Sequence, residues 1–139
     1  MERDIIVDTG PLVAYLNKRD AWHDWAVARL SEVEPPLETC EAVLTEASFL
    51  LRGDARGPDA LLALLERGHL VCRFQVDQEA EHLRRLMKRY ADVPMSLADA
   101  CLVRITEERR QAKVLTLDSD FRRYRRLGRQ VIPLISPKQ

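Results

Sequence analysis

The pattern of apolar and polar positions along the chain predicts short strands that alternate with longer helices. Short runs rich in Ile, Val and Leu, bounded by polar or turn residues, are typical of buried strands. Longer segments with apolar residues three or four positions apart are typical of helices that bury one side. We expect strands at 4–8, 37–40, 70–76, 113–117 and 131–135, helices at 9–17, 21–33, 41–52, 58–67, 77–90 and 96–110, and a further short helix after 117.

This alternation predicts the fold class. Strands that are separated by helices pair in parallel through right-handed crossovers. We therefore expect an α/β fold, a three-layer α/β/α sandwich with a mostly parallel sheet of four to five strands. Because 139 residues are enough for one domain with a substantial core and too few for two, we expect a single domain over 1–139.

The composition is that of an ordinary globular protein, with 46% hydrophobic and 32% charged residues. No apolar run is long enough to span a bilayer, and the first residues lack the basic flank and apolar stretch of a signal peptide. We therefore expect a cytoplasmic protein with no membrane partner. The cysteines show no metal-binding spacing and are predicted to be buried free thiols, and the isolated histidines are predicted to be surface residues (Cys40, Cys72, Cys101; His23, His69, His82).

The charge is unevenly distributed, although the net charge is zero. Residues 104–139 carry ten Lys and Arg against four Asp and Glu, and most of this excess lies in "DFRRYRRLGRQ" at 120–130. One interpretation is the solvated face of a helix. The other is a surface that contacts phosphates, so a nucleic-acid partner is compatible with the sequence.

Four carboxylates are predicted to lie at one edge of the sheet. In a parallel sheet with helices, function usually lies beyond the carboxyl ends of the strands. Asp8 ends the first strand and Asp118 directly follows the strand at 113–117. The helices that carry Glu46 and Asp99 both begin at this edge, so the chain brings four distant acids to one place.

Each acid also has a structural interpretation. Asp8 or Asp118 could cap a following helix, and "SLAD" at 96–99 has the form of a capping box around Asp99. Glu46 is different because it lies in the middle of a helix among Ala42, Val43, Phe49 and Leu50, which we expect to face the core. A buried carboxylate needs a partner, and the alternative to a metal site is an ion pair with Arg52 or a distant arginine.

A divalent cation is the simplest way to hold four carboxylates together. Two carboxylates about 4 Å apart repel by roughly 4 kcal/mol at an effective dielectric constant of about 20. No Lys or Arg is a close sequence neighbour of these acids. Because all the ligands would be oxygens, the sequence predicts a hard ion, Mg²⁺ or Mn²⁺, rather than zinc.

The segments around the four acids resemble the motifs of PIN domains, the nuclease fold that includes VapC-type toxins of toxin–antitoxin pairs. The matching segments are "IIVDTGPLVAYL" (5–16), "VLTEASFLL" (43–51), "SLADACLVRI" (96–105) and "VLTLDSDF" (114–121), in family order and across nearly the whole chain. The resemblance implies an acidic catalytic site of Asp8, Glu46, Asp99 and Asp118, with Asp8 and Asp99 as the direct metal ligands. Thr9 and Thr116 match positions where the family often has a hydroxyl. Asp120 is the alternative to Asp118 as the fourth acid; we favour Asp118, and expect Asp120 to orient arginines or the helix start.

The same resemblance implies a function. It implies a Mg²⁺- or Mn²⁺-dependent endoribonuclease that leaves 5′-phosphate and 3′-hydroxyl ends, forms a homodimer and is silenced by an antitoxin protein. Arginines 122, 123, 125, 126 and 129 could steer the RNA backbone, and Trp22 or Trp25 could form a partner surface or the edge of the core. The alternatives are a PIN-fold module that binds RNA or protein without cutting, and an RNA-processing nuclease outside a toxin pair. The motifs of haloacid-dehalogenase phosphatases, receiver domains and P-loop proteins are missing.

Overall fold

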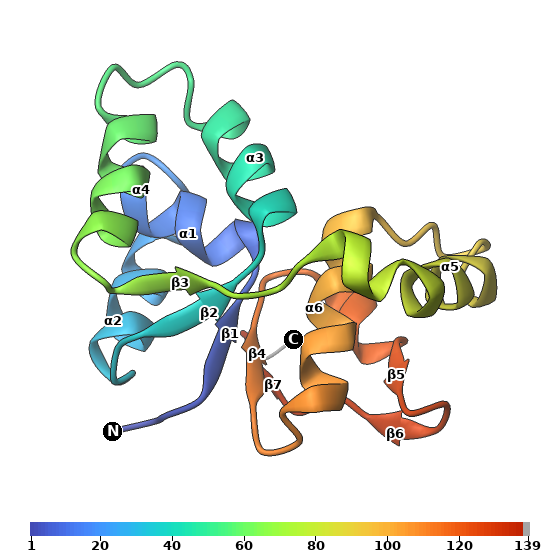
Figure 1. The fold of residues 1–139 in the computed structure, drawn as a ribbon. Helices are drawn as coiled ribbons and strands as arrows, with labels where there is room; N and C mark the ends of the chain where they lie inside the picture. The colour runs from blue at the N-terminus through green and yellow to red at the C-terminus, as the bar shows by residue number, and fades with distance from the viewer. Residues whose placement is uncertain (138–139) are drawn as a thin grey trace.

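A single parallel sheet forms the centre of the molecule. The computed structural model describes residues 1–137, so the last two residues of the predicted domain lie outside the described part. Five strands pair in the order β3-β2-β1-β4-β7, and every pairing is parallel (Figure 1). Their bounds are β1 (Ile5–Val7), β2 (Leu37–Thr39), β3 (Leu70–Cys72), β4 (Lys113–Leu115) and β7 (Leu134–Ile135). The predicted α/β class and parallel sheet are confirmed.

Helices cover both faces of this sheet. In Figure 1, α1, α2 and α4 lie to the left of the strands and α5 and α6 to the right, while α3 contacts α1, α4 and α6. The helices are α1 (Thr9–Leu16), α2 (His23–Ser31), α3 (Glu41–Leu50), α4 (Gly57–Glu66), α5 (Ala80–Arg89) and α6 (Leu97–Glu108), with a 3-10 turn η1 (Val76–Glu79) before α5. The centre of α6 is fully buried over residues 100–103, because it packs against the sheet and α5.

The C-terminal region differs from the prediction. A 3-10 turn η2 (Ser119–Arg122) is followed by an antiparallel hairpin of β5 (Arg125–Arg126) and β6 (Gln130–Val131). Leu127 and Gly128 both have positive φ angles at its turn. The predicted strand at 131–135 is thus divided between β6 and β7, and the basic segment is not one helix face. Arg126 is buried and donates to the carbonyl of Thr106, so it supports the end of α6 instead of facing RNA.

The cysteines and tryptophans differ in burial, and one cysteine departs from the prediction. Cys40 and Cys101 are buried as predicted, but Cys72 is only half-buried, because β3 is the edge strand of the sheet. Trp22 is 46% exposed, whereas Trp25 packs against the core; their rings meet edge to face at 6.3 Å.

Among residues 1–137, no helix combines the length and apolarity that crossing a bilayer requires.

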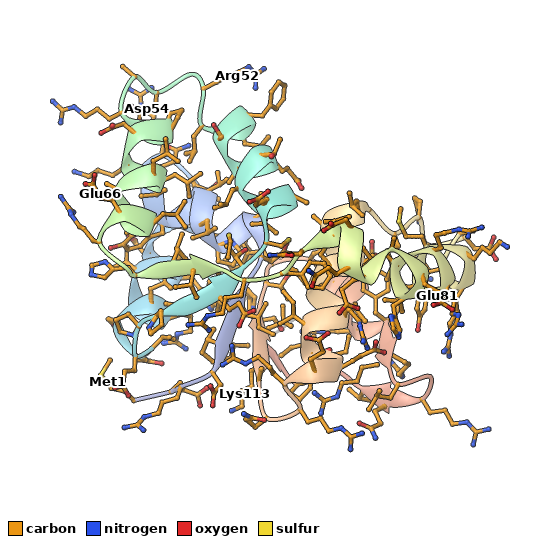
Figure 2. The ribbon with its side chains drawn as sticks, in the orientation of Figure 1. Met1, Arg52, Asp54, Glu66, Glu81 and Lys113 are labelled. Carbon is orange, nitrogen blue, oxygen red and sulfur yellow. The ribbon has the colours of Figure 1, made fainter. Side chains whose placement is uncertain are left out.

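An ion-pair network stabilises the amino edge of the sheet. Glu38, in the middle of β2, is buried and accepts a hydrogen bond from Arg109 at the end of α6. The same guanidinium donates to Asp4, just before β1, at 2.9 Å. Nearby, Lys113 of β4 pairs with Glu2 at 3.1 Å, and Figure 2 shows Lys113 at the lower edge of the ribbon. This edge lies opposite the carboxyl ends of the strands.

Candidate active site

Asp8 is the most buried of the predicted site residues and is held at both oxygens. It follows β1 and caps α1, and its Oδ1 accepts a hydrogen bond from the Thr9 amide at 2.8 Å. Its Oδ2 accepts from the Thr116 hydroxyl at 2.7 Å. Thr116 Oγ1 in turn accepts from the amide of Asp118 at 2.9 Å, so one hydroxyl links two of the acids. The side chain of Asp8 is therefore fixed in position, and the capping interpretation holds together with the predicted location.

Asp99 is oriented by hydrogen bonds from two directions. It forms the predicted capping box with Ser96 at the start of α6. In addition, the phenol of Tyr124 donates to Asp99 Oδ2 at 2.9 Å. Tyr124 is fully buried and meets the rings of Tyr90 and Phe121 edge to face. A buried aromatic cluster thus fixes one oxygen of Asp99.

Asp118 and Asp120 have different local partners. Asp118 caps η2, because its Oδ1 accepts from the amide of Asp120 at 2.9 Å. Asp120 lies 3.8 Å from a guanidinium nitrogen of Arg123, in agreement with the prediction that it orients an arginine. The helix-start function predicted for Asp120 belongs instead to Asp118.

Glu46 reaches the same site as expected, because α3 begins directly after β2, but its surroundings differ from the prediction. The expectation that its apolar neighbours face the core holds for Val43, which is fully buried, but is wrong for Phe49 and Leu50, which are 58% and 52% exposed. Glu46 itself is exposed on α3. Its Oε2 accepts a hydrogen bond at 3.4 Å from the hydroxyl of Thr9, which is the residue next to Asp8. Glu46 therefore borders the site from the solvent side, with no buried ion pair.

The acids line one open cavity at the carboxyl edge of the sheet. Its volume is about 420 Å³. The lining residues are Asp8, Thr9, Gly10, Glu46, Leu50, Pro94, Ser96, Asp99, Leu117, Asp118 and Asp120. Among residues 1–137 this lining includes no Lys or Arg, so no basic side chain of the described part separates the carboxylates. The predicted gathering of Asp8, Glu46, Asp99 and Asp118 is observed, and their catalytic function stays a prediction.

The environment disfavours the ionised forms of the two central acids. Burial, together with the smaller effect of the charges of Asp99 and Asp118, raises the pKa of Asp8 from 3.8 to about 6, against the lowering effect of its two hydrogen bonds. Burial likewise raises the pKa of Asp99, although Tyr124 and the Ser96 amide favour its ionised form. Positive charge in the cavity would relieve this cost.

The donor chemistry of the cavity fits a hard cation. Its candidate ligands are all carboxylate oxygens, which suit Mg²⁺ or Mn²⁺. Within residues 1–137, no three His, Cys, Asp or Glu side chains form a ready-made metal cage. Mg²⁺ needs no such cage, since proteins often bind it through one or two carboxylates, with water and substrate phosphates as the other ligands. Asp8 and Asp99, the predicted metal ligands, both line the cavity and are carboxylates of this kind.

The raised pKa of Asp8 predicts a pH-dependent stability of the metal-free protein. Because this pKa is about 6 in the folded chain against an ordinary 3.8, the folded chain holds the proton more tightly than the unfolded chain does. The contribution of protonated Asp8 to the free energy of unfolding is present in full below pH 3.8 and is lost as the pH rises through about 6. This pKa shift corresponds to a loss of about 3 kcal/mol in the free energy of unfolding. Urea unfolding in EDTA should show the wild type losing stability relative to Asp8→Asn over this range, and a pH-independent difference would contradict the prediction.

Tyr124 is a site residue that the sequence did not reveal. Nothing in "RRYRRL" separates a tyrosine that contacts an acid from one that only packs in the core. Tyr124→Phe keeps the ring and removes the donor to Asp99, a predicted metal ligand. We therefore expect the nuclease activity that the resemblance implies to fall about 10- to 100-fold, the range for loss of a group that orients a metal ligand. Tyr90→Phe is the control, because the Tyr90 hydroxyl accepts from the Arg125 amide and touches no acid. Equal losses in both variants would mean that the effect is structural.

The comparisons with known proteins agree with this geometry. Residues 5–127 match the PIN domain family. Among solved structures, the chain is similar to Mycobacterium tuberculosis VapC20, described as a sarcin–ricin-loop-cleaving toxin, with a TM-score of 0.73 and 24% identity over 84% of this chain and 91% of that one. No curated protein shows significant sequence similarity to the chain. Because the family match spans most of its length, the chain belongs to the PIN domain family.

Proposed function

We propose that this protein is a metal-dependent endoribonuclease and the toxin of a VapBC-type pair. The observation that carries the proposal is the cavity in which Asp8, Asp99 and Asp118 meet without a basic side chain in the lining. A structural cluster of acids would be paired with arginines, as Glu38 is at the opposite edge. Unpaired acids in an open cavity, with a raised pKa at two of them, are characteristic of a functional site.

The chain's own residues position the reacting groups. Asp8 and Asp99 are the proposed ligands of a Mg²⁺ or Mn²⁺ ion. When bound, such an ion would supply Lewis-acid charge at the scissile phosphate and an activated water. Thr116 fixes Asp8, and Tyr124 and Ser96 fix Asp99, so both carboxylates are held before substrate arrives. Asp118 and Glu46 add negative charge on two further sides of the cavity, where they could orient the water or a second ion.

The substrate and partners follow from the family resemblance. VapC20 is described as a toxin that cleaves the sarcin–ricin loop, which supports RNA as the substrate class here. Hydrolysis is expected to leave 5′-phosphate and 3′-hydroxyl ends. The homodimer and the antitoxin are also proposals, and exposed apolar side chains on α3 and α4 provide a surface for association (Phe49, Leu50, Leu62).

A cleavage assay with and without metal tests the proposal. The purified protein would be incubated with an RNA hairpin that carries the sarcin–ricin loop and with a single-stranded RNA of mixed sequence. We expect cleavage with Mg²⁺ or Mn²⁺, none in EDTA, and products with a 5′-phosphate. Binding of RNA without cleavage under every metal condition would instead support a non-enzymatic RNA-binding module.

A further inference from the structure

A small recess lies beside the acidic cavity and shares a wall with it. Leu117 and Asp118 line both spaces. The recess has a volume of about 70 Å³. Its lining residues are Trp22, Leu117, Asp118, Ser119, Arg122, Ser136 and Pro137. A water molecule occupies about 30 Å³ in the liquid, so the recess holds about two waters and is too small to enclose a nucleobase. A base could only lie across its mouth.

Trp22 is the aromatic side chain at this recess. It is 46% exposed at the start of α2, while Trp25 supports its ring edge to face. A large exposed aromatic residue is uncommon on a monomeric surface, where Trp is usually mostly buried. The guanidinium of Arg122 lies at the same recess and donates to the carbonyl of Pro137 at 3.2 Å and to Ser136 Oγ at 3.3 Å.

We propose that the exposed indole of Trp22 is a stacking platform for a nucleobase of the RNA substrate, next to the nucleotide whose phosphate lies at the acids. The proposal rests on the proposed nuclease function and names a binding site for that substrate. Stacking on an aromatic ring suits every base, so the platform would bind single-stranded RNA with little sequence preference. The stacked base would lie near the acids, because Asp118 lines both the recess and the acidic cavity.

The chemistry around Trp22 favours RNA over a protein partner. The indole lines a recess that contains the charged side chains of Asp118 and Arg122 and shares a wall with the acidic cavity, instead of lying in a broad apolar surface. Arg122 adds positive charge there, which suits a phosphate between two nucleotides. The most exposed apolar side chains of α3 and α4 do not line this recess (Phe49, Leu50, Leu62).

Kinetics of Trp22 variants provide the first test. With the mixed-sequence single-stranded RNA, Trp22→Ala is expected to raise KM by roughly 5- to 150-fold, the range for loss of one stacked base. The change in kcat should be much smaller, because Trp22 contacts no reacting atom. Trp22→Phe should restore most of the affinity. Val27→Ala, which removes another exposed apolar side chain of α2 outside the recess, should leave both constants unchanged.

Tryptophan fluorescence provides the second test, because the chain contains only two tryptophans. In Trp25→Phe the emission comes from Trp22 alone, and saturating single-stranded RNA in EDTA should quench it. In Trp22→Phe the remaining emission comes from Trp25, which packs against the core and should respond little.

The outcomes separate this proposal from the proposed function. An unchanged KM in Trp22→Ala, in a protein that cleaves RNA, would overturn the stacking platform and leave the nuclease intact. Absence of Trp22 quenching by bound RNA would also overturn the stacking platform. If Trp22→Ala keeps its RNA affinity but loses binding to a protein partner, Trp22 belongs to a protein interface. Quenching of Trp22 by RNA, in a protein that cleaves no RNA with Mg²⁺ or Mn²⁺, would support the platform and count against the nuclease.

Discussion

Asp8→Asn is expected to reduce metal-dependent RNA cleavage about a thousandfold or more. Loss of a metal ligand removes several kcal/mol of charge stabilisation in the transition state, and each 1.4 kcal/mol corresponds to about tenfold in rate. Asp8 is only 6% exposed, and hydrogen bonds from Thr9 and Thr116 hold its carboxylate in place. The variant therefore removes a carboxylate whose position is fixed. Initial rates of cleavage under saturating Mn²⁺ would measure the effect.

Folding of the Asp8→Asn variant is not expected to be impaired. The buried carboxylate, with its raised pKa, costs stability at neutral pH, so its removal should leave the metal-free protein as stable as the wild type or more so. Mn²⁺ should raise the melting temperature of the wild type and have little effect on the variant. Asp59→Asn, an exposed acid in the first turn of α4, is the control and should retain full activity. Full activity in Asp8→Asn would remove this residue from the site.

The second large effect concerns stability at the opposite edge of the sheet. Arg109→Met is expected to lower the free energy of unfolding by about 3 kcal/mol, because removal of one partner of a buried ion pair leaves the other uncompensated. Glu38 is 7% exposed on β2, and its remaining cation, Arg73, is 3.9 Å away with a side chain that is 61% exposed. Equilibrium unfolding in urea measures the change.

A double variant distinguishes the buried charge from other effects of the change. In Glu38→Met with Arg109→Met both charges are absent, and most of the lost stability should return, since apolar residues of similar volume can replace a buried pair. Arg110→Met, at an exposed neighbouring position, should change stability little. A double variant as unstable as Arg109→Met alone would show that the packing of Arg109, not the charge of Glu38, determines the loss.

The location of all four acids was predictable from the sequence. Alternating strands and helices predict a parallel sheet, and in such a sheet residues that directly follow strands meet at one edge. Asp8 directly follows β1, and Asp118 lies shortly after the end of β4. Asp99 lies in the first turn of α6. These positions depend on local order along the chain, which the pattern of apolar residues records.

Glu46 was placed at this edge on correct grounds, the start of its helix directly after a strand, but one further argument about its neighbours was wrong. Its apolar neighbours indicated a core-facing position, but Phe49 and Leu50 are exposed. A sequence does not distinguish an exposed apolar residue from a buried one when both follow helical spacing. Glu46 lies at the cavity because α3 begins at the carboxyl edge of the sheet and contacts α1 and α6.

Local periodicity and short motifs were enough to predict the parallel sheet, the edge at which the acids gather and the family to which the motifs belong. Three features became known only from the folded structure: the hairpin in the basic segment, the hydrogen bond from Tyr124 to Asp99 and the pairing of Glu38 with Arg109. Tyr124 and Asp99 are separated by 25 positions, and Arg109 and Glu38 by 71. Such contacts depend on how helices and strands pack against one another, which the local pattern of residues does not specify.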